Sequence, residues 1–253
     1  MRKTAALATF LLFATASPGA EEAESPNLHA PFDALLKETV KDGLVDYKAL
    51  EKREEALDAY LSSLADYDAA SRPRAERLAF WINAYNAFAL KLVLEHYPGI
   101  DSVNDVEKPW DTKLAKAAGK LRSLNEIEHE ILRKEFEDPR IHFAIVCASI
   151  SCPDLRSRAY VAEKLDEQLD AAATRFLADP DKGFRVAEKD EEEVVVEVSK
   201  IFEWFAEDFV IHSGSIYQYI LKYVPPEDAA LLKSRRRDVR VRFMDYDWGL
   251  NGK

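Results

Sequence analysis

A helical stretch without a single charge constrains the fold of this chain more than any other feature. Between Arg77 and Lys91 the sequence reads LAFWINAYNAFAL, which places apolar residues around the whole circumference of a helix. We therefore expect a helix over about residues 74–96 that is buried on nearly every side, and Pro98-Gly99 to end it. A chain of 253 residues is long enough to surround such a helix with a core.

Three polar side chains, Asn83, Tyr85 and Asn86, interrupt this apolar stretch. Asn86 falls near the middle of the most apolar face of the predicted helix. Burying an amide without partners costs about 1–3 kcal/mol, so these amides must bond something specific. Either they tie the helix to neighbouring loops, or they line a site together with Tyr85 and bind a substrate.

The other periodicities predict one helix-rich α+β domain over residues 31–251, with a small antiparallel sheet. Ser123 and Glu126 form a capping box at the start of one helix. The expected helices cover residues 32–43, 50–64, 124–136, 161–178, 199–209 and 216–224, and the expected strands cover 141–147, 184–186, 194–198 and 239–244.

The first residues resemble a secretory signal. Arg2 and Lys3 precede a short apolar core, and small residues offer a cleavage site after residue 16 or as late as residue 20. Residues 17–30 then form a flexible lead. This pattern predicts a periplasmic or secreted protein, and the apolar core falls short of the roughly 20 residues that span a bilayer.

Net charge narrows the range of partners. The chain carries a formal charge of -11, which disfavours nucleic acid and anionic membrane. No cofactor is indicated, because the sequence has neither a Gly-rich phosphate loop nor histidines at metal-ligand spacing. We expect the partner to be a small molecule or a peptide.

The predicted helix 124–136 contains a carboxylate on its apolar face. Glu128 points into that face, and His129 lies at its edge. A buried carboxylate is either paired or has a raised pKa. Glu128 is therefore a structural partner of an arginine or a catalytic acid or base.

The only two cysteines, Cys147 and Cys152, lie in the segment IHFAIVCASISCPDL at 141–155. In a regular strand His142 and Cys147 would point to opposite faces, so a thiolate at Cys147 would take its base from elsewhere, with His129 as one candidate. Alternatively, the two cysteines form a small disulfide loop or act as a redox pair. A zinc site built on them is the weakest of these hypotheses.

The segment DYDWGLN at 245–251 follows directly on a predicted strand. Its polar groups can therefore lie at a strand end, where Asp245 could orient a catalytic base and Asp247 and Trp248 could bind a substrate. The alternative is a capped turn.

Together these motifs resemble the family called domain of unknown function 547. The resemblance covers about residues 31–251, and Gly249 stands where the family's closing motif is expected to have Ser. The layout is also similar to papain-like and transglutaminase-like enzymes, although the central helix here has no cysteine. The segments that carry the resemblance are PFDALLKETVKDGLVDY, FWINAYNAF, SLNEIEHEILR, DPRIHFAIVCASISCPDL, the dipeptide AY at 159–160, and DYDWGLN.

These observations lead to one main hypothesis and two alternatives. The main hypothesis is a hydrolase or transferase for an amide or thioester, with Cys147 as nucleophile, His129 or His142 as base, and Glu128 or Asp245 orienting that base. The alternatives are a binding module with a Cys147–Cys152 disulfide and a thiol redox protein.

Overall fold

The computed structural model describes residues 27–190 and 192–252. The predicted signal at 1–16 and most of the predicted lead at 17–30 lie outside these residues. The first described helix, α1, begins at Ala30.

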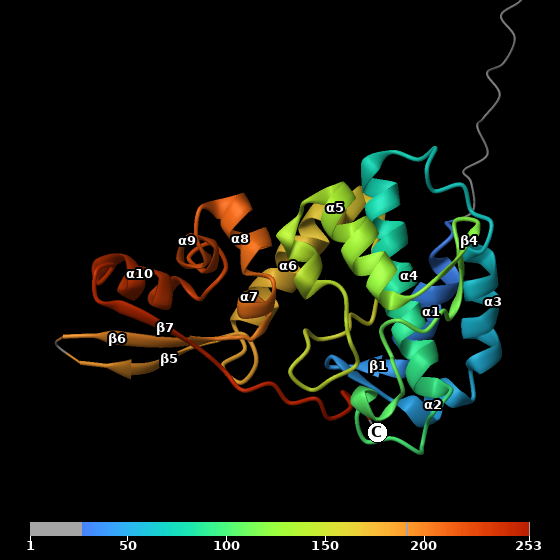
Figure 1. Cartoon of the computed structure of the whole chain (residues 1–253), viewed down its shortest axis with the longest axis horizontal. Helices are drawn as coiled ribbons and strands as arrows, with labels where there is room; N and C mark the ends of the chain where they lie inside the picture. Colours follow the sequence, from blue (N-terminus) through green and yellow to red (C-terminus); the bar gives the residue numbers. More distant parts are fainter. Residues whose placement is uncertain (1–26, 191, 253) are drawn as a thin grey trace, which may run out of the picture.

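The described residues form an α+β structure of ten α-helices and three small sheets, which confirms the predicted α+β class, although the sequence predicts a single small sheet. Figure 1 shows an elongated molecule with α1 to α4 at one end, α5 and α6 nearer the middle, and the largest sheet with α9 and α10 at the other end. The α-helices are α1 Ala30–Thr39, α2 Tyr47–Glu51, α3 Glu54–Leu64, α4 Arg74–Leu94, α5 Arg133–Phe136, α6 Leu165–Leu177, α7 Ile201–Trp204, α8 Ala206–Ser213, α9 Ile216–Ile220 and α10 Pro226–Ser234. The 3-10 helices are η1 Val103–Asp105, η3 Pro139–Phe143 and η4 Ala162–Lys164, and η2 Glu126–Leu132 is a π-helix.

Helix α4 is the buried centre of its end of the molecule. Every residue from Leu78 to Leu90 is buried, which confirms the prediction from the charge-free stretch. The helix ends one turn before Pro98-Gly99. The capping box of Ser123 and Glu126 is also present at the start of η2.

The sheets correct part of the prediction. Two are hairpins of very short strands, β1 Val40–Lys41 with β2 Leu44–Val45 and β3 Ala115–Ala117 with β4 Lys120–Arg122. In the third, β5 Phe184–Lys189 and β6 Val194–Val198 form the predicted antiparallel hairpin. β7 Val239–Phe243 pairs with β6 in the parallel direction, so this sheet is mixed. The parallel pairing is possible because α7 to α10 form a long crossover between the two strands.

The apolar residues gather in two clusters. The first surrounds α4 and takes in residues from Phe32 to Leu169, and the second lies between the mixed sheet and α6 to α10. Helix α6 contributes to both, with Leu165 and Leu169 in the first and Phe176 and Leu177 in the second. The helix therefore connects the two halves of the molecule, as its central position in Figure 1 shows.

Residues 245–252 run from β7 back across the molecule to the helical end (Figure 1). Along this path they make isolated bridges to Ser149, Ser102 and Val45. The Tyr47 hydroxyl donates to Asn251 Oδ1 over 2.8 Å. We call residues 245–252 the closing segment, because it joins three distant parts of the chain.

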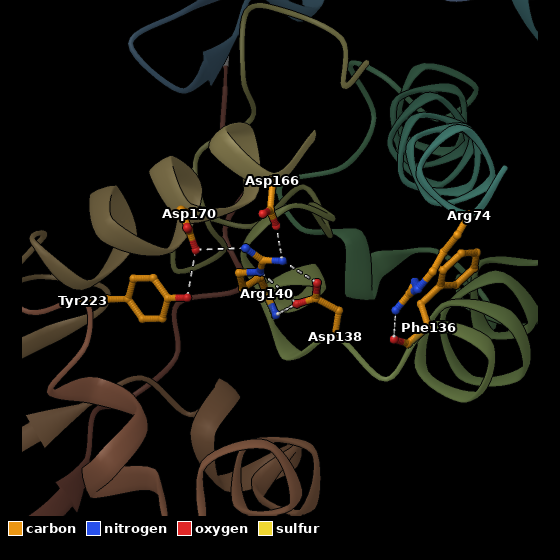
Figure 2. Close-up of polar contacts among 7 residues, drawn as sticks. All are labelled: Arg74, Phe136, Asp138, Arg140, Asp166, Asp170 and Tyr223. Carbon is orange, nitrogen blue, oxygen red and sulfur yellow. Dashed lines mark hydrogen bonds and ion pairs between the residues drawn. The ribbon is translucent and has the colours of Figure 1, made fainter. Parts of the chain in front are cut away.

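Arg140 anchors the start of the segment that leads to the cysteines. Its guanidinium donates to Asp138 over 2.7 Å, to Asp166 over 2.7 Å and to Asp170 over 3.0 Å. Asp170 also accepts from the Tyr223 hydroxyl over 2.9 Å, as Figure 2 shows. One guanidinium thus ties η3 to α6 and, through Asp170, to the turn after α9.

Replacing Arg140 with Met should lower the free energy of unfolding by about 2–4 kcal/mol, because Asp138 then keeps a largely buried charge without its partner. Urea denaturation of the full chain measures this loss. The matched control is Asp166→Asn, which should change stability by less than about 1 kcal/mol because that carboxylate is exposed. A loss below about 1 kcal/mol for Arg140→Met would contradict an anchoring role.

Candidate functional site

The expected strand over residues 141–147 is wrong. Pro139–Phe143 forms the 3-10 helix η3, begun by Asp138, whose carboxylate accepts from the Arg140 amide. The amides of Ala144 and Ile145 then donate back to the Ile141 carbonyl, as in a helical turn. Because these groups bond within the segment and to α4, no neighbouring strand is needed. The parity argument that separated His142 from Cys147 therefore does not apply.

Asn86 holds the backbone just before Cys147. Its Nδ2 donates to the Ala144 carbonyl over 2.9 Å, and its Oδ1 accepts from the Val146 amide over 2.9 Å. Asn83, one turn earlier on α4, makes the same pair of bonds with the backbone of Tyr160. Both amides thus bond the main chain through their nitrogen and their oxygen, and neither lines the pocket described below.

Three polar side chains surround the Cys147 sulfur. Its Sγ lies 2.8 Å from the Cys152 sulfur, 2.9 Å from Ser149 Oγ and 3.3 Å from the Tyr246 hydroxyl. Both cysteines are free thiols in this structure. Ala148, next to Cys147, has a φ of 65°, a left-handed conformation that is uncommon outside glycine. This tight turn brings Ser149 and Cys152 back to the sulfur.

These contacts separate the acidities of the two thiols. The hydrogen bond from Cys152 has the largest effect on Cys147, and together with those from Ser149 and Tyr246 it outweighs burial and lowers the pKa of Cys147 to about 6. Burial, followed by the neighbouring Cys147, raises the pKa of Cys152 well above its ordinary value. Cys147 is therefore the thiol that ionises near neutral pH.

The Cys147 side chain lines a cavity of about 190 Å³, which we call the thiol pocket. The pocket lies at the junction of the two apolar clusters, because its walls come from α4, η2, α7 and the closing segment. Seven residues proposed from the sequence meet there: Tyr85, Glu128, His129, His142, Cys147, Cys152 and Trp248. The other lining residues are Trp110, Asn125, Ile145, Pro153, Ile201, Trp204, Phe205 and Tyr246.

Glu128 reaches the thiol pocket from the π-helix η2. π-helical turns are rare in proteins, and those that occur are often found at functional sites. The Tyr85 hydroxyl donates to Glu128 Oε2 over 3.2 Å, and no arginine bonds this carboxylate within the described residues. Burial raises the pKa of Glu128 to about 7, against the smaller opposing effect of the Tyr85 bond. Glu128 can therefore hold or release a proton near neutral pH.

His142 is paired with Asp208 on α8. Its Nε2 lies 2.7 Å from Asp208 Oδ2, and its ring stacks on Phe205 with the centroids 4.0 Å apart. Arg133 donates to both oxygens of Asp208 over 2.7 and 2.9 Å. Burial lowers the pKa of His142, so its imidazole is neutral at pH 7. Asp208 fixes the orientation of this ring.

His129 belongs to the same polar group. Arg133 donates to its Nδ1 over 3.0 Å. Burial and then the charge of Arg133 lower the pKa of His129. Among the described residues, no hydrogen bond joins either histidine to the Cys147 sulfur, so any proton transfer between them passes through a molecule in the pocket.

Four aromatic rings form one wall of the thiol pocket. The ring centroids of Tyr246 and Trp248 are 4.6 Å apart, and those of Trp204 and Tyr246 are 4.8 Å apart. Trp110 packs against Trp248 at 6.4 Å. Trp204 remains 45 % exposed, so the wall extends to the surface. Such a wall suits a ligand with a flat or apolar part.

The two carboxylates proposed from the closing segment do not line the thiol pocket. Asp245 is exposed. Asp247 Oδ1 accepts from the Gly249 amide over 2.8 Å, as in a capped turn. The sequence predicts Glu128 or Asp245 as the carboxylate that orients the catalytic base. In the structure, the carboxylate that bonds His142 is Asp208.

Sequence reasoning missed three residues that bond the main groups of the pocket. Ser149 and Tyr246 contact the sulfur, and Asp208 pairs with His142. Tyr246 lies within the motif DYDWGLN at 245–251, so this motif could have indicated it. Asp208 had none, because it lies on the polar side of an otherwise ordinary amphipathic helix.

The described residues contain neither a metal site nor a membrane-spanning helix. No group of three or more His, Cys, Asp or Glu side chains could hold a metal ion there. No helix in the same residues is both long and apolar enough to cross a membrane.

Comparison with known families matches residues 69–177 to a domain described as "Protein of unknown function, DUF547". The match covers α4, η2, the cysteine segment and α6. It does not extend to the motifs at 31–47 and 245–251, which carry the wider resemblance. No curated protein matches the chain. No solved structure matches it either, so the expected likeness to papain-like and transglutaminase-like enzymes has no support.

Replacing Asn86 with Leu should lower the free energy of unfolding by about 3 kcal/mol, because the Ala144 carbonyl and the Val146 amide lose their partner. It should also change the rate of Cys147 alkylation, since these groups hold the backbone before the thiol. Asn83→Leu is the matched control, with a similar loss of stability and no change in alkylation. Equal alkylation in both variants would show that Asn86 does not position the thiol.

The alkylation rate of Cys147 by iodoacetamide should rise with pH around a midpoint near 6. Tyr246→Phe should move that midpoint upward by on the order of one pH unit, because the thiolate loses a donor and ionises at higher pH. Mass spectrometry after timed quenching measures the rate at each pH. Tyr217→Phe, which removes a tyrosine bond to the Leu232 carbonyl away from the pocket, should leave the midpoint unchanged.

Proposed function

We propose that the thiol pocket is the active site of a thiol-dependent hydrolase or transferase acting on an amide or thioester. The observation that carries this proposal is the environment of the Cys147 sulfur, which has three polar contacts, a lowered pKa and an open face toward a pocket. A thiolate with a pKa near neutrality is the reactive form of a nucleophilic cysteine.

The proposed reaction proceeds in two steps. The Cys147 thiolate attacks the carbonyl carbon, a carbon–sulfur bond forms, and the bond to the leaving amine or thiol breaks. Water or another acceptor then attacks the thioester and releases the thiolate. The leaving group takes up one proton in the first step, and the attacking water gives up one in the second.

Glu128 and His142 are the proposed carriers of these protons. Glu128, with its pKa raised to about 7, is partly protonated at neutral pH and can supply a proton to the leaving group. His142 is neutral, is held by Asp208 and can accept a proton from water. This pairing of an imidazole with a carboxylate has the logic of a catalytic triad.

Acyl transfer from p-nitrophenyl acetate tests the proposal with a generic substrate. We expect release of nitrophenolate together with one acetyl group on Cys147, located by peptide mass spectrometry, and no acetylation there in Cys147→Ser. His142→Asn should slow the turnover by about 100-fold, the usual contribution of a general base. His96→Gln, a change at an exposed histidine outside the pocket, should leave turnover unaltered.

Acetylation of Cys147 no faster than that of the unfolded chain in urea would contradict the proposal. That result would favour the alternative of a binding module, in which the same pocket holds a ligand without reacting.

Thiol redox chemistry is a second candidate, favoured by the 2.8 Å separation of the two sulfurs and by their opposite pKa shifts. A reactive thiol beside a protonated partner is the arrangement of a dithiol redox pair. Cys152→Ser separates the two functions, because a serine hydroxyl still donates to Cys147 but cannot form a disulfide. The hydrolase proposal requires this variant to keep acyl transfer. The redox proposal requires it to stop at the mixed disulfide of Cys147 with glutathione, because no second thiol is left to displace the glutathione.

Export from the cytoplasm is also part of the proposal. It rests on the charged start, the short apolar core and the small residues of positions 1–16. Determining the N-terminal residue of the mature protein tests it directly.

A further inference from the structure

A second cavity, of about 290 Å³, lies directly behind the turn that carries Cys152. Pro153 lines both cavities, and His142 faces the thiol pocket while its neighbour Phe143 faces this one. The thiol pocket has an aromatic wall, whereas the second cavity is lined by three basic side chains, Arg156, Arg175 and Lys182, and by two acidic ones, Asp154 and Asp179. We call it the basic cavity.

Two of these three cations have no acidic partner. Lys182 Nζ pairs with Asp154 Oδ1 over 2.6 Å, and Asp179 Oδ1 accepts from the Asp181 amide. Arg156 and Arg175 make no ion pair with any described residue. The chain has 46 acidic and 35 basic residues, so two unpaired guanidiniums lining one cavity are unexpected.

Arg156 also has an unsatisfied donor. Its Nε is buried and has no hydrogen-bond partner, while its guanidinium carbon lies 5.3 Å from the centre of the Tyr160 ring. Arg175 lines the same cavity.

We propose that the basic cavity binds an oxyanion, the phosphate or carboxylate group of a small molecule, through Arg156 and Arg175. A planar guanidinium presents two parallel N–H donors that match the oxygens of either group. Such an anion neutralises both free charges. The aromatic ring of Tyr160 holds Arg156 in place from the other side. This site is independent of the thiol chemistry proposed above.

Calorimetric titration of the full chain with inorganic phosphate, and separately with succinate, tests the site at constant ionic strength. We expect saturable binding of at least one of the two, and the anion that binds identifies whether the ligand carries phosphate or carboxylate. Arg175→Gln should weaken binding at least about 10-fold, because it removes one of two charged contacts. Arg175 is exposed, so this variant is expected to fold.

Arg237→Gln is the matched control, since it removes the same charge from an exposed turn outside the cavity. Binding that weakens equally in Arg237→Gln and Arg175→Gln reflects net charge alone and overturns the proposal. Absence of saturable binding for both anions overturns it as well. Arg156→Gln supplies a second test, with the far-UV circular dichroism spectrum and Cys147 alkylation showing that the variant has folded.

Discussion

The placement of the thiol depends on one pair of hydrogen bonds, those between the Asn86 side chain and the backbone at Ala144 and Val146. Helix α4 is enclosed by apolar neighbours, so its amide side chains cannot turn to water and must find partners inside the protein. A buried amide that bonds both an N–H and a C=O of one segment fixes that segment in position and direction. Cys147 follows Val146 directly, so the position of its sulfur is fixed relative to α4.

The two apolar clusters meet where this segment runs, and the thiol pocket lies at their junction. Each cluster is ordinary by itself, but neither contains all the polar groups of the pocket. The first supplies Glu128 through η2 and Cys147, and the second supplies Tyr246. Arg140 and α6 keep the halves together. Rigid support from both sides is what a site needs to hold polar groups at fixed distances.

Periodicity in the sequence was sufficient for the elements whose environment is uniform. Helix α4, the capping box before η2 and the hairpin of β5 and β6 were predicted because their patterns extend over many residues. Residues 141–147 were predicted as a strand because an apolar run of that length has no periodicity of its own. Its true structure depends on Asn86, which lies about sixty positions earlier. The parallel pairing of β7 with β6 and the pairing of His142 with Asp208 also depend on residues that are far apart in the sequence. The sequence therefore indicated which segments form the site and not which side chains meet.

The closing segment links the acidity of the thiol to a part of the chain that is distant in sequence. Tyr246 stands 99 positions after Cys147, and it reaches the sulfur only when residues 245–252 have bonded to the segments around Ser102 and Ser149. A chain that lacks the closing segment therefore has Cys147 without the Tyr246 contact, and the pKa of its thiol lies closer to that of an ordinary cysteine. The lowered pKa of Cys147 is thus a property of the folded molecule with the closing segment in place, and the cysteine segment alone does not provide it.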